Sequence, residues 1–225
     1  MTDRDLAILQ LAHRHVVATA DVLLPLFFDD CTPKAVERVV TKLLGEDLLR
    51  SQPLFGQRCC YTLTQKSARL LGLDEKRYAL PLGPTSVIKN FAILHFCLGG
   101  SQKRSRMTLD EFRTRFPHLL ARGMSHDRYY IDDFSRLSLF VCDHGSDWRR
   151  LTRKVRTEAN RRKVLPGWEQ FFADRLFSVT LLSSSPQKTT RLTKALSAEA
   201  FPVIVATVPD LARFFGHHPQ GDAAR

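Results

Sequence analysis

Three cations recur at intervals of four residues in one stretch of the chain: Lys34, Arg38 and Lys42. In an α-helix this spacing stacks the side chains on one face, because residues four apart lie one turn above each other. Ammonium and guanidinium groups in such a row can neutralise phosphates, and phosphate contacts supply most of a protein's affinity for DNA. The row therefore predicts a phosphate-binding surface, with a merely solvated helix face as the alternative interpretation.

A helix over residues 33–44 would position these cations. Pro33 suits the first helical position, where its missing N–H costs nothing, and Thr32 suits the preceding N-cap. The opposite face carries a core-facing apolar stripe: Val36, Val39, Val40, Leu43 and Leu44. A buried back and a basic front are what a helix docked in the major groove of DNA requires.

A two-stranded hairpin is predicted directly after this helix. Residues 48–52 alternate like a strand, residues 55–58 suit a turn, and residues 59–63 form the return strand. The pattern places three more candidate DNA contacts at or near the hairpin tip: Arg50, Gln57 and Arg58.

Two helices are predicted before residue 30, and a closing helix after the hairpin ends at Gly72, which tolerates the left-handed conformation. The order helix, helix, helix, hairpin is that of a winged helix-turn-helix. Residues 1–73 therefore predict a winged-helix DNA-binding domain.

The charge of the chain agrees with an anionic partner. Lys and Arg number 34 against 23 Asp and Glu, a formal net charge of +11. Because no apolar run is long enough to cross a membrane, double-stranded DNA is the expected partner and a membrane is not. The first five residues lack the features of a signal peptide, so a cytoplasmic location is expected. The five cysteines are odd in number and lack Cys-x-x-Cys spacing, so no metal site is assigned.

The second half of the chain predicts a separate α/β domain. Residues 74–84 contain Pro81, Gly83 and Pro84 and suit a linker. Beyond them, helices alternate with short strands rich in β-branched and aromatic residues, at residues 129–132, 137–143, 177–182 and 202–207. Strands of this kind indicate an α/β layer that is buried on both faces. The predicted domain spans residues 85–216, and residues 217–225 form a flexible tail.

A second basic helix is expected at residues 148–163. Its apolar positions would seat it on the sheet: Trp148, Leu151, Val155 and Ala159. Its eight cations, opposed by Glu158 alone, are expected to project outward: Arg149, Arg150, Arg153, Lys154, Arg156, Arg161, Arg162 and Lys163. A run of one sign opposes helix formation unless an anion offsets it. Arg149, Arg150, Arg153 and Arg156 are therefore candidate contacts to the DNA backbone.

Taken together, the two halves resemble the bacterial replication-relaxation family, proteins of plasmids and mobile elements that include mobilisation proteins. The resemblance covers nearly the whole chain and rests on the order and spacing of four short strings, at residues 4–9, 46–49, 61–64 and 201–205. It implies a C-terminal α/β domain similar to the restriction-endonuclease fold, in degenerate form. It also implies a transcriptional regulator or a replication or mobilisation accessory factor, with relaxosome or replication proteins as partners. A homodimer, or a docking role for the α/β domain, stays open.

The resemblance also implies a candidate nuclease centre. Nuclease chemistry on that fold needs carboxylates at strand ends to hold Mg²⁺ and a Lys near the scissile phosphate. Asp132 or Asp133 would supply the first carboxylate and Asp143 the second, with Lys154 reaching in from the following helix. Relatives tend to carry Glu-x-Asp where this chain has Val141, so one carboxylate is missing, and both earlier aspartates also suit a turn. We therefore expect a DNA-binding protein without a cofactor, with a Mg²⁺-dependent endonuclease or relaxase-like nicking enzyme as the alternative.

Overall fold

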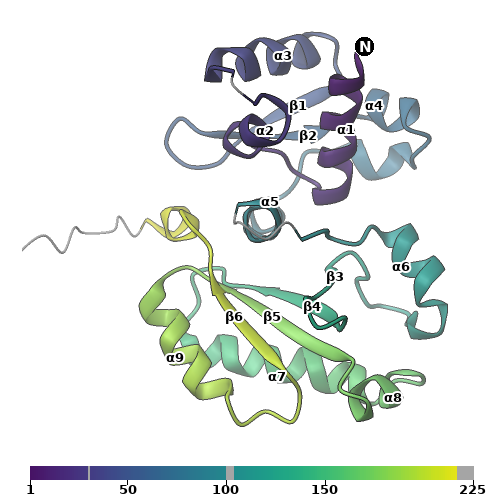
Figure 1. Cartoon of the computed structure of the whole chain (residues 1–225), viewed down its shortest axis with the longest axis vertical. Coiled ribbons are helices and arrows are strands. Elements are labelled where there is room, and N and C mark those ends of the chain that lie inside the picture. The colour runs from purple at the N-terminus through teal and green to yellow at the C-terminus, as the bar shows by residue number, and fades with distance from the viewer. Residues whose placement is uncertain (30, 100–103, 217–225) are drawn as a thin grey trace, which may run out of the picture. The chain divides into compact units, whose positions relative to one another are not determined.

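The structure is a computed structural model that describes residues 1–29, 31–99 and 104–216 (Figure 1). The chain divides into two units, Met1–Gly99 and Gly100–Arg225. It is mixed α/β, and its described residues form a two-stranded sheet in the first unit and a four-stranded sheet in the second. The tail predicted at residues 217–225 lies outside the described residues. In the part of the chain that is described, no helix has both the length and the apolar character needed to span a membrane.

The first unit begins with three helices and a hairpin. The elements are α1 (Asp3–His15), α2 (Ala20–Phe27), α3 (Pro33–Gly45), β1 (Leu49–Pro53), β2 (Cys59–Leu63) and the closing helix α4 (Gln65–Leu70). The two strands are antiparallel, and Ala18 adds a bridge to Tyr61 at the hairpin edge, with N–H···O distances of 2.9 and 2.8 Å. These elements agree with the predicted order.

The apolar face of α3 lies in the core of this unit, as its spacing predicts. Val36, Val40 and Leu43 are buried in one cluster with Ile8 and Leu9 of α1. Thr32 occupies the N-cap position and Pro33 the first turn, but the threonine side chain makes no capping hydrogen bond. The outward face of α3 is therefore fixed by burial of the opposite face.

The 3-10 helix η1 (Glu75–Tyr78) and helix α5 (Pro84–Leu98) also belong to the first unit. This differs from the expected linker at residues 74–84 with the second domain starting at residue 85. The reason is aromatic packing: Phe91 of α5 meets Phe55 of the hairpin tip edge to face, with ring centroids 5.8 Å apart. The predicted linker contains the 3-10 helix η1, and composition did not indicate the unit on which the next helix packs.

The segment before α5 is also attached to the hairpin. The side-chain amide of Gln52 donates to the carbonyl of Leu82 at 3.0 Å and accepts the N–H of Leu82 at 3.1 Å. A side chain that satisfies both backbone groups of a residue acts like a short strand pairing. The predicted linker therefore follows the surface of the first unit.

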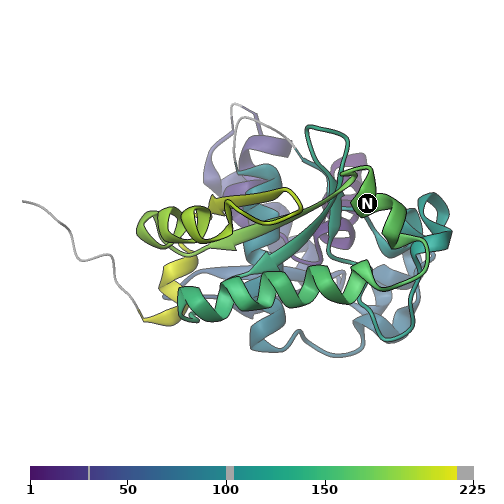
Figure 2. The same ribbon diagram turned by 90° about the horizontal axis from the view of Figure 1, so that it is seen from below.

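The second unit is built on a sheet with the strand order β3-β4-β5-β6. The strands are β3 (Tyr129–Ile131), β4 (Leu137–Cys142), β5 (Phe177–Ser183) and β6 (Val203–Thr207). The helices are α6 (Leu109–Arg115), η2 (Pro117–Leu119), α7 (Trp148–Lys163), α8 (Trp168–Ala173), α9 (Pro186–Leu196) and η3 (Leu211–Phe215). β3 is antiparallel to β4, while β4, β5 and β6 are parallel and are connected through α7 and α9 (Figure 2).

The strands β4 and β5 are buried along their whole length, which agrees with their continuous apolar sequence. One face forms the main core with α7 and α9 through Leu139, Val141, Val179, Leu181, Leu151, Val155, Ala159 and Leu192. On the other face, the hydroxyl oxygens of Tyr130 and Ser138 each lie 2.8 Å from that of Thr180. Packing against the first face orients α7.

Candidate nucleic-acid interface

The cation row on α3 is divided by the structure. Lys34 and Arg38 are exposed and form no ion pair with any described residue. Lys42, one turn further on, is bound by Asp5 of α1, with Nζ 2.7 Å from Oδ2. Two of the three predicted cations are therefore available to a phosphate.

The Lys42–Asp5 pair joins α3 to the start of α1. The Asp5 side chain is 3% exposed, and its carboxylate also accepts the backbone N–H of Thr2 at 2.8 Å. Burial alone would raise the pKa of Asp5, but the hydrogen bonds from Lys42 and Thr2 outweigh burial and lower that pKa. The bond to Asp5 in turn raises the pKa of Lys42. Lys42 thus joins α3 to α1 through an ion pair while its side chain stays 42% exposed, and its place among the DNA contacts stays a prediction.

The hairpin tip is tied to its own unit. Gln57 is exposed in the turn, as predicted. Arg58 is turned toward α2, where it forms an ion pair of 2.7 Å with Asp21, and its guanidinium lies 5.2 Å from the ring centroid of Phe55. Burial tends to raise the pKa of Asp21, but the hydrogen bond from Arg58 contributes to a net lowering of that pKa. Of the three predicted tip contacts, Gln57 is the one that the structure places exposed in the turn.

Arg50 is not at the hairpin tip. The strand register pairs it with Thr62 at the base, because β1 begins at Leu49 and the turn lies beyond Pro53. Its Nη2 donates to the carbonyl of Ala79 at 3.4 Å. Its predicted position near the tip is corrected.

The apolar side of helix α7 faces the core, as the spacing of its residues predicts. Trp148, Leu151, Val155 and Ala159 pack in or against the main core. Five cations of the helix are exposed and form no ion pair with the described residues: Arg149, Arg150, Arg153, Arg161 and Lys163. Arg156 is also exposed but pairs with Glu199 at 2.7 Å, so this candidate contact is already bound within the unit.

Arg162 contradicts the outward expectation because its side chain is fully buried. Its Nε donates to the Tyr129 hydroxyl at 2.7 Å, and its Nη1 donates to the Glu158 carboxylate at 2.8 Å. The signal that could have found it is spacing, since position 162 continues the buried stripe three residues after Ala159.

The candidate nuclease carboxylates are not brought together. The N–H of Asp132 donates to the carbonyl of Arg136 at 2.9 Å, which places Asp132 beside the start of β4. Asp143 follows the end of β4. Since the six residues of β4, at about 3.3 Å each, lie between these levels, the two aspartates are roughly 20 Å apart. One metal ion cannot bridge this distance.

The earlier aspartates have roles in the turn after β3. The Asp132 carboxylate accepts the backbone N–H groups of Phe134 and Arg136 at 3.0 and 2.9 Å, and the Arg136 side chain at 2.8 Å. Asp133 is exposed and lies 3.3 Å from the guanidinium of Arg104. These contacts agree with the turn interpretation of both residues.

Asp143 is instead the centre of a polar cluster at the carboxyl end of β4. It is fully buried and accepts two backbone N–H groups of the following loop at 2.9 and 3.1 Å. It also accepts the Ser184 hydroxyl at 2.6 Å and the Lys188 ammonium at 2.7 Å. Lys154, the expected partner, forms no ion pair with the described residues. Lys188 was detectable in principle, because parallel strands bring the loops after β4 and β5 to one edge.

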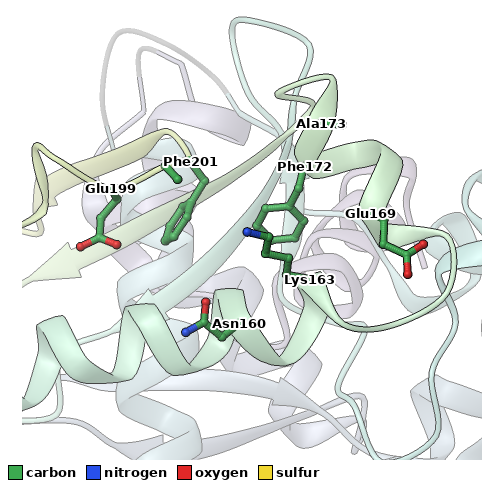
Figure 3. Close-up of a pocket in the computed structure, with 8 residues that line it drawn as sticks. Asn160, Lys163, Glu169, Phe172, Ala173, Glu199 and Phe201 are labelled. Atoms are coloured by element: carbon green, nitrogen blue, oxygen red, sulfur yellow. The ribbon is translucent and has the colours of Figure 1, made fainter.

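Among the described residues, no group of three or more His, Cys, Asp or Glu side chains is placed to hold a metal ion. A cavity of about 350 Å³ does open beside α7 (Figure 3). Its lining includes Asn160, Lys163, Glu169, Phe172, Glu199 and Phe201. Asn160 and Lys163 extend from α7 toward the two phenylalanine rings, with the two glutamates at the sides. The two carboxylates in this lining disfavour a phosphate inside the cavity.

Comparisons of the chain with family models, with curated proteins and with solved structures find no match. The surfaces of the chain that bear on its function are the outward face of α3 and the outward face of α7.

Proposed function

We propose that the first unit is a winged helix-turn-helix domain that binds double-stranded DNA with sequence preference through α3. The observation that carries the proposal is the outward face of this helix. Lys34 and Arg38 stand exposed there without an ion pair among the described residues, while Val36, Val40 and Leu43 hold the opposite face in the core. In helix-turn-helix domains the recognition helix enters the major groove, and cations beside it contact phosphates.

The arrangement around α3 supports this proposal. Three helices precede an antiparallel hairpin, and the bridge between Ala18 and Tyr61 extends the hairpin by a third segment. Since Arg58 is paired with Asp21, the hairpin offers fewer free cations than its sequence indicates. The α3 cations would then supply the main phosphate contacts of this unit.

The resemblance to replication-relaxation proteins supports a role as a transcriptional regulator or as a replication or mobilisation accessory factor of a plasmid or mobile element. In this proposal the second unit is a degenerate restriction-endonuclease-like domain without a catalytic role. The separation of Asp132 from Asp143 supports that part, because it leaves the expected metal site without its second carboxylate.

Selection of bound duplexes from a random pool tests the proposal. The full-length protein should enrich a common sequence, and the variant Lys34→Ala/Arg38→Ala should bind that sequence more weakly. The slope of log affinity against log salt should fall in magnitude by about 1.8, because two fewer phosphates are neutralised.

The matched control is Lys76→Ala/Arg77→Ala, which removes two exposed cations from η1 of the same unit. This control should retain the affinity and the salt slope of the wild type. Enrichment of no sequence, or equal affinity and slope for the wild type and the α3 variant, would refute the proposal.

A further inference from the structure

The outward face of α7 carries charge of one sign. Five exposed cations on it form no ion pair with the described residues: Arg149, Arg150, Arg153, Arg161 and Lys163. Glu158, the one acidic residue within the helix sequence, is turned inward to Arg162 at 2.8 Å and to Arg128 at 3.5 Å. Because a helix rises 1.5 Å per residue, the cations extend over roughly 20 Å.

This arrangement is unfavourable for the helix itself. Arg149 and Arg153 are like charges four residues apart, which repel each other on a helix surface. Arg149 and Arg150 also lie in the first turn, where the helix dipole disfavours cations, and the acidic group at this end is the N-cap Asp147, which accepts the N–H of Arg149 at 3.1 Å. An anionic partner along this face would offset both effects.

The charge excess of the whole chain is concentrated in the same unit. Residues 1–99 contain 12 Lys and Arg against 10 Asp and Glu, whereas residues 100–225 contain 22 against 13. The nearby carboxylate of Glu199 is already paired with Arg156 and does not neutralise the exposed cations. The second unit therefore has the stronger attraction for a polyanion.

We propose that the outward face of α7 binds the sugar–phosphate backbone of duplex DNA without reading its sequence. A regular array of phosphates complements a row of arginines of this length. The buried stripe of Leu151, Val155 and Ala159 holds α7 lengthwise against the sheet. The exposed cations would meet the DNA at the ends of long side chains, and contacts of such groups to phosphates carry no sequence information. Binding by this face does not depend on sequence-specific binding by α3, and it adds a second DNA contact to the function proposed above.

The test uses the full-length protein with Arg149→Ala/Arg153→Ala/Arg161→Ala. Its affinity is measured across salt concentrations for the duplex that the wild type enriches and for a random duplex of equal length. Loss of three phosphate contacts should reduce the salt slope by about 2.7, which at about 0.1 M salt corresponds to roughly a hundredfold or greater loss of affinity. Both duplexes should be affected by the same factor.

The control is Arg113→Ala/Arg115→Ala/Arg122→Ala, which changes the net charge equally at exposed positions outside α7. Circular dichroism and thermal melting verify that both variants are folded. A folded α7 variant with wild-type affinity and slope would overturn the proposal. If the wild type enriches no sequence but the α7 variant alone loses random-duplex binding, the α3 proposal fails and the α7 proposal stands.

Discussion

Replacement of Arg162 by Met should destabilise the second unit, whereas the same replacement of Arg161 should have little effect. Arg162 is fully buried and donates to the Tyr129 hydroxyl at 2.7 Å and to the Glu158 carboxylate at 2.8 Å. Arg161, the preceding residue, is exposed. Met retains most of the apolar length of the side chain and removes the charge and the donors, so the pair of variants isolates the buried contacts.

The expected loss in the free energy of unfolding is about 2–3 kcal/mol. An unpartnered buried hydroxyl on Tyr129 costs about 1–2 kcal/mol, and the charge-assisted bond to Glu158 contributes about 1.5–3 kcal/mol. Two effects reduce this sum. Glu158 remains paired with Arg128 at 3.5 Å after the substitution. Nη2 of Arg162 is buried without a hydrogen bond to a described residue, so the substitution also removes the unfavourable free energy of burying this group. The melting temperature should fall by roughly 10 °C.

Urea unfolding followed by tryptophan fluorescence measures this loss. Both tryptophans of the chain are in the second unit: Trp168 is in its core, and the partly buried Trp148 packs against that core. The Arg162 guanidinium lies 5.7 Å from the ring centroid of Trp168. The signal therefore reports the unit that contains the substitution. If the unfolding free energies of the Arg162→Met and Arg161→Met proteins agreed within about 0.5 kcal/mol, the interpretation of Arg162 as a buried anchor would be refuted.

Three further predictions follow from the buried groups. Cys31 is exposed and should be alkylated in the native protein. Burial raises the pKa of Cys60 to about 12, so Cys60 should be alkylated only after unfolding. Mass spectrometry of the labelled peptides distinguishes the two cysteines. Asp143→Ala should cost about 2–4 kcal/mol in urea unfolding and leave plasmid nicking with Mg²⁺ unchanged; loss of a metal-dependent nicking activity would instead favour the nuclease alternative. Burial alone would raise the pKa of Glu158, but the bond from Arg162 and nearby arginine charges lower it. The ionised Glu158 carboxylate therefore stabilises the folded protein fully above its unfolded pKa of about 4.3. This stabilisation is lost as the pH falls through the lower folded pKa. Below about pH 4, the unfolding free energy of the wild type should drop toward that of Glu158→Gln.

The elements of the chain could be predicted because their signals are local. Thr108 and Glu111, three residues apart, form a capping box at the start of α6, with the Thr108 N–H 2.8 Å from the Glu111 carboxylate. Gly72 follows α4 with a φ of +69°, a left-handed conformation that glycine tolerates. The spacing of Leu151, Val155 and Ala159 correctly predicted the buried side of α7. Each of these signals depends on residues within a few turns of one another.

Pairs between distant elements could not be predicted in the same way. Lys42 and Asp5 are separated by 37 residues, and Lys188 and Asp143 by 45. Periodicity shows whether a position faces solvent or the core, but not which carboxylate stands opposite it. For that reason the sequence identified the basic surfaces but not the cations that are already bound within each unit.

The tip of the hairpin is preorganised. Phe55 packs edge to face on Phe91 at 5.8 Å, and Arg58 is paired with Asp21 at 2.7 Å. A segment that is already ordered loses little conformational entropy when a partner binds, unlike arms that fold on contact. Association through this unit would therefore approach rigid-body docking, with a small heat-capacity change from ordering. In the DNA complex proposed above, a tip held by these contacts would adapt little to a mismatched site, so discrimination would be concentrated in the few base pairs that face α3.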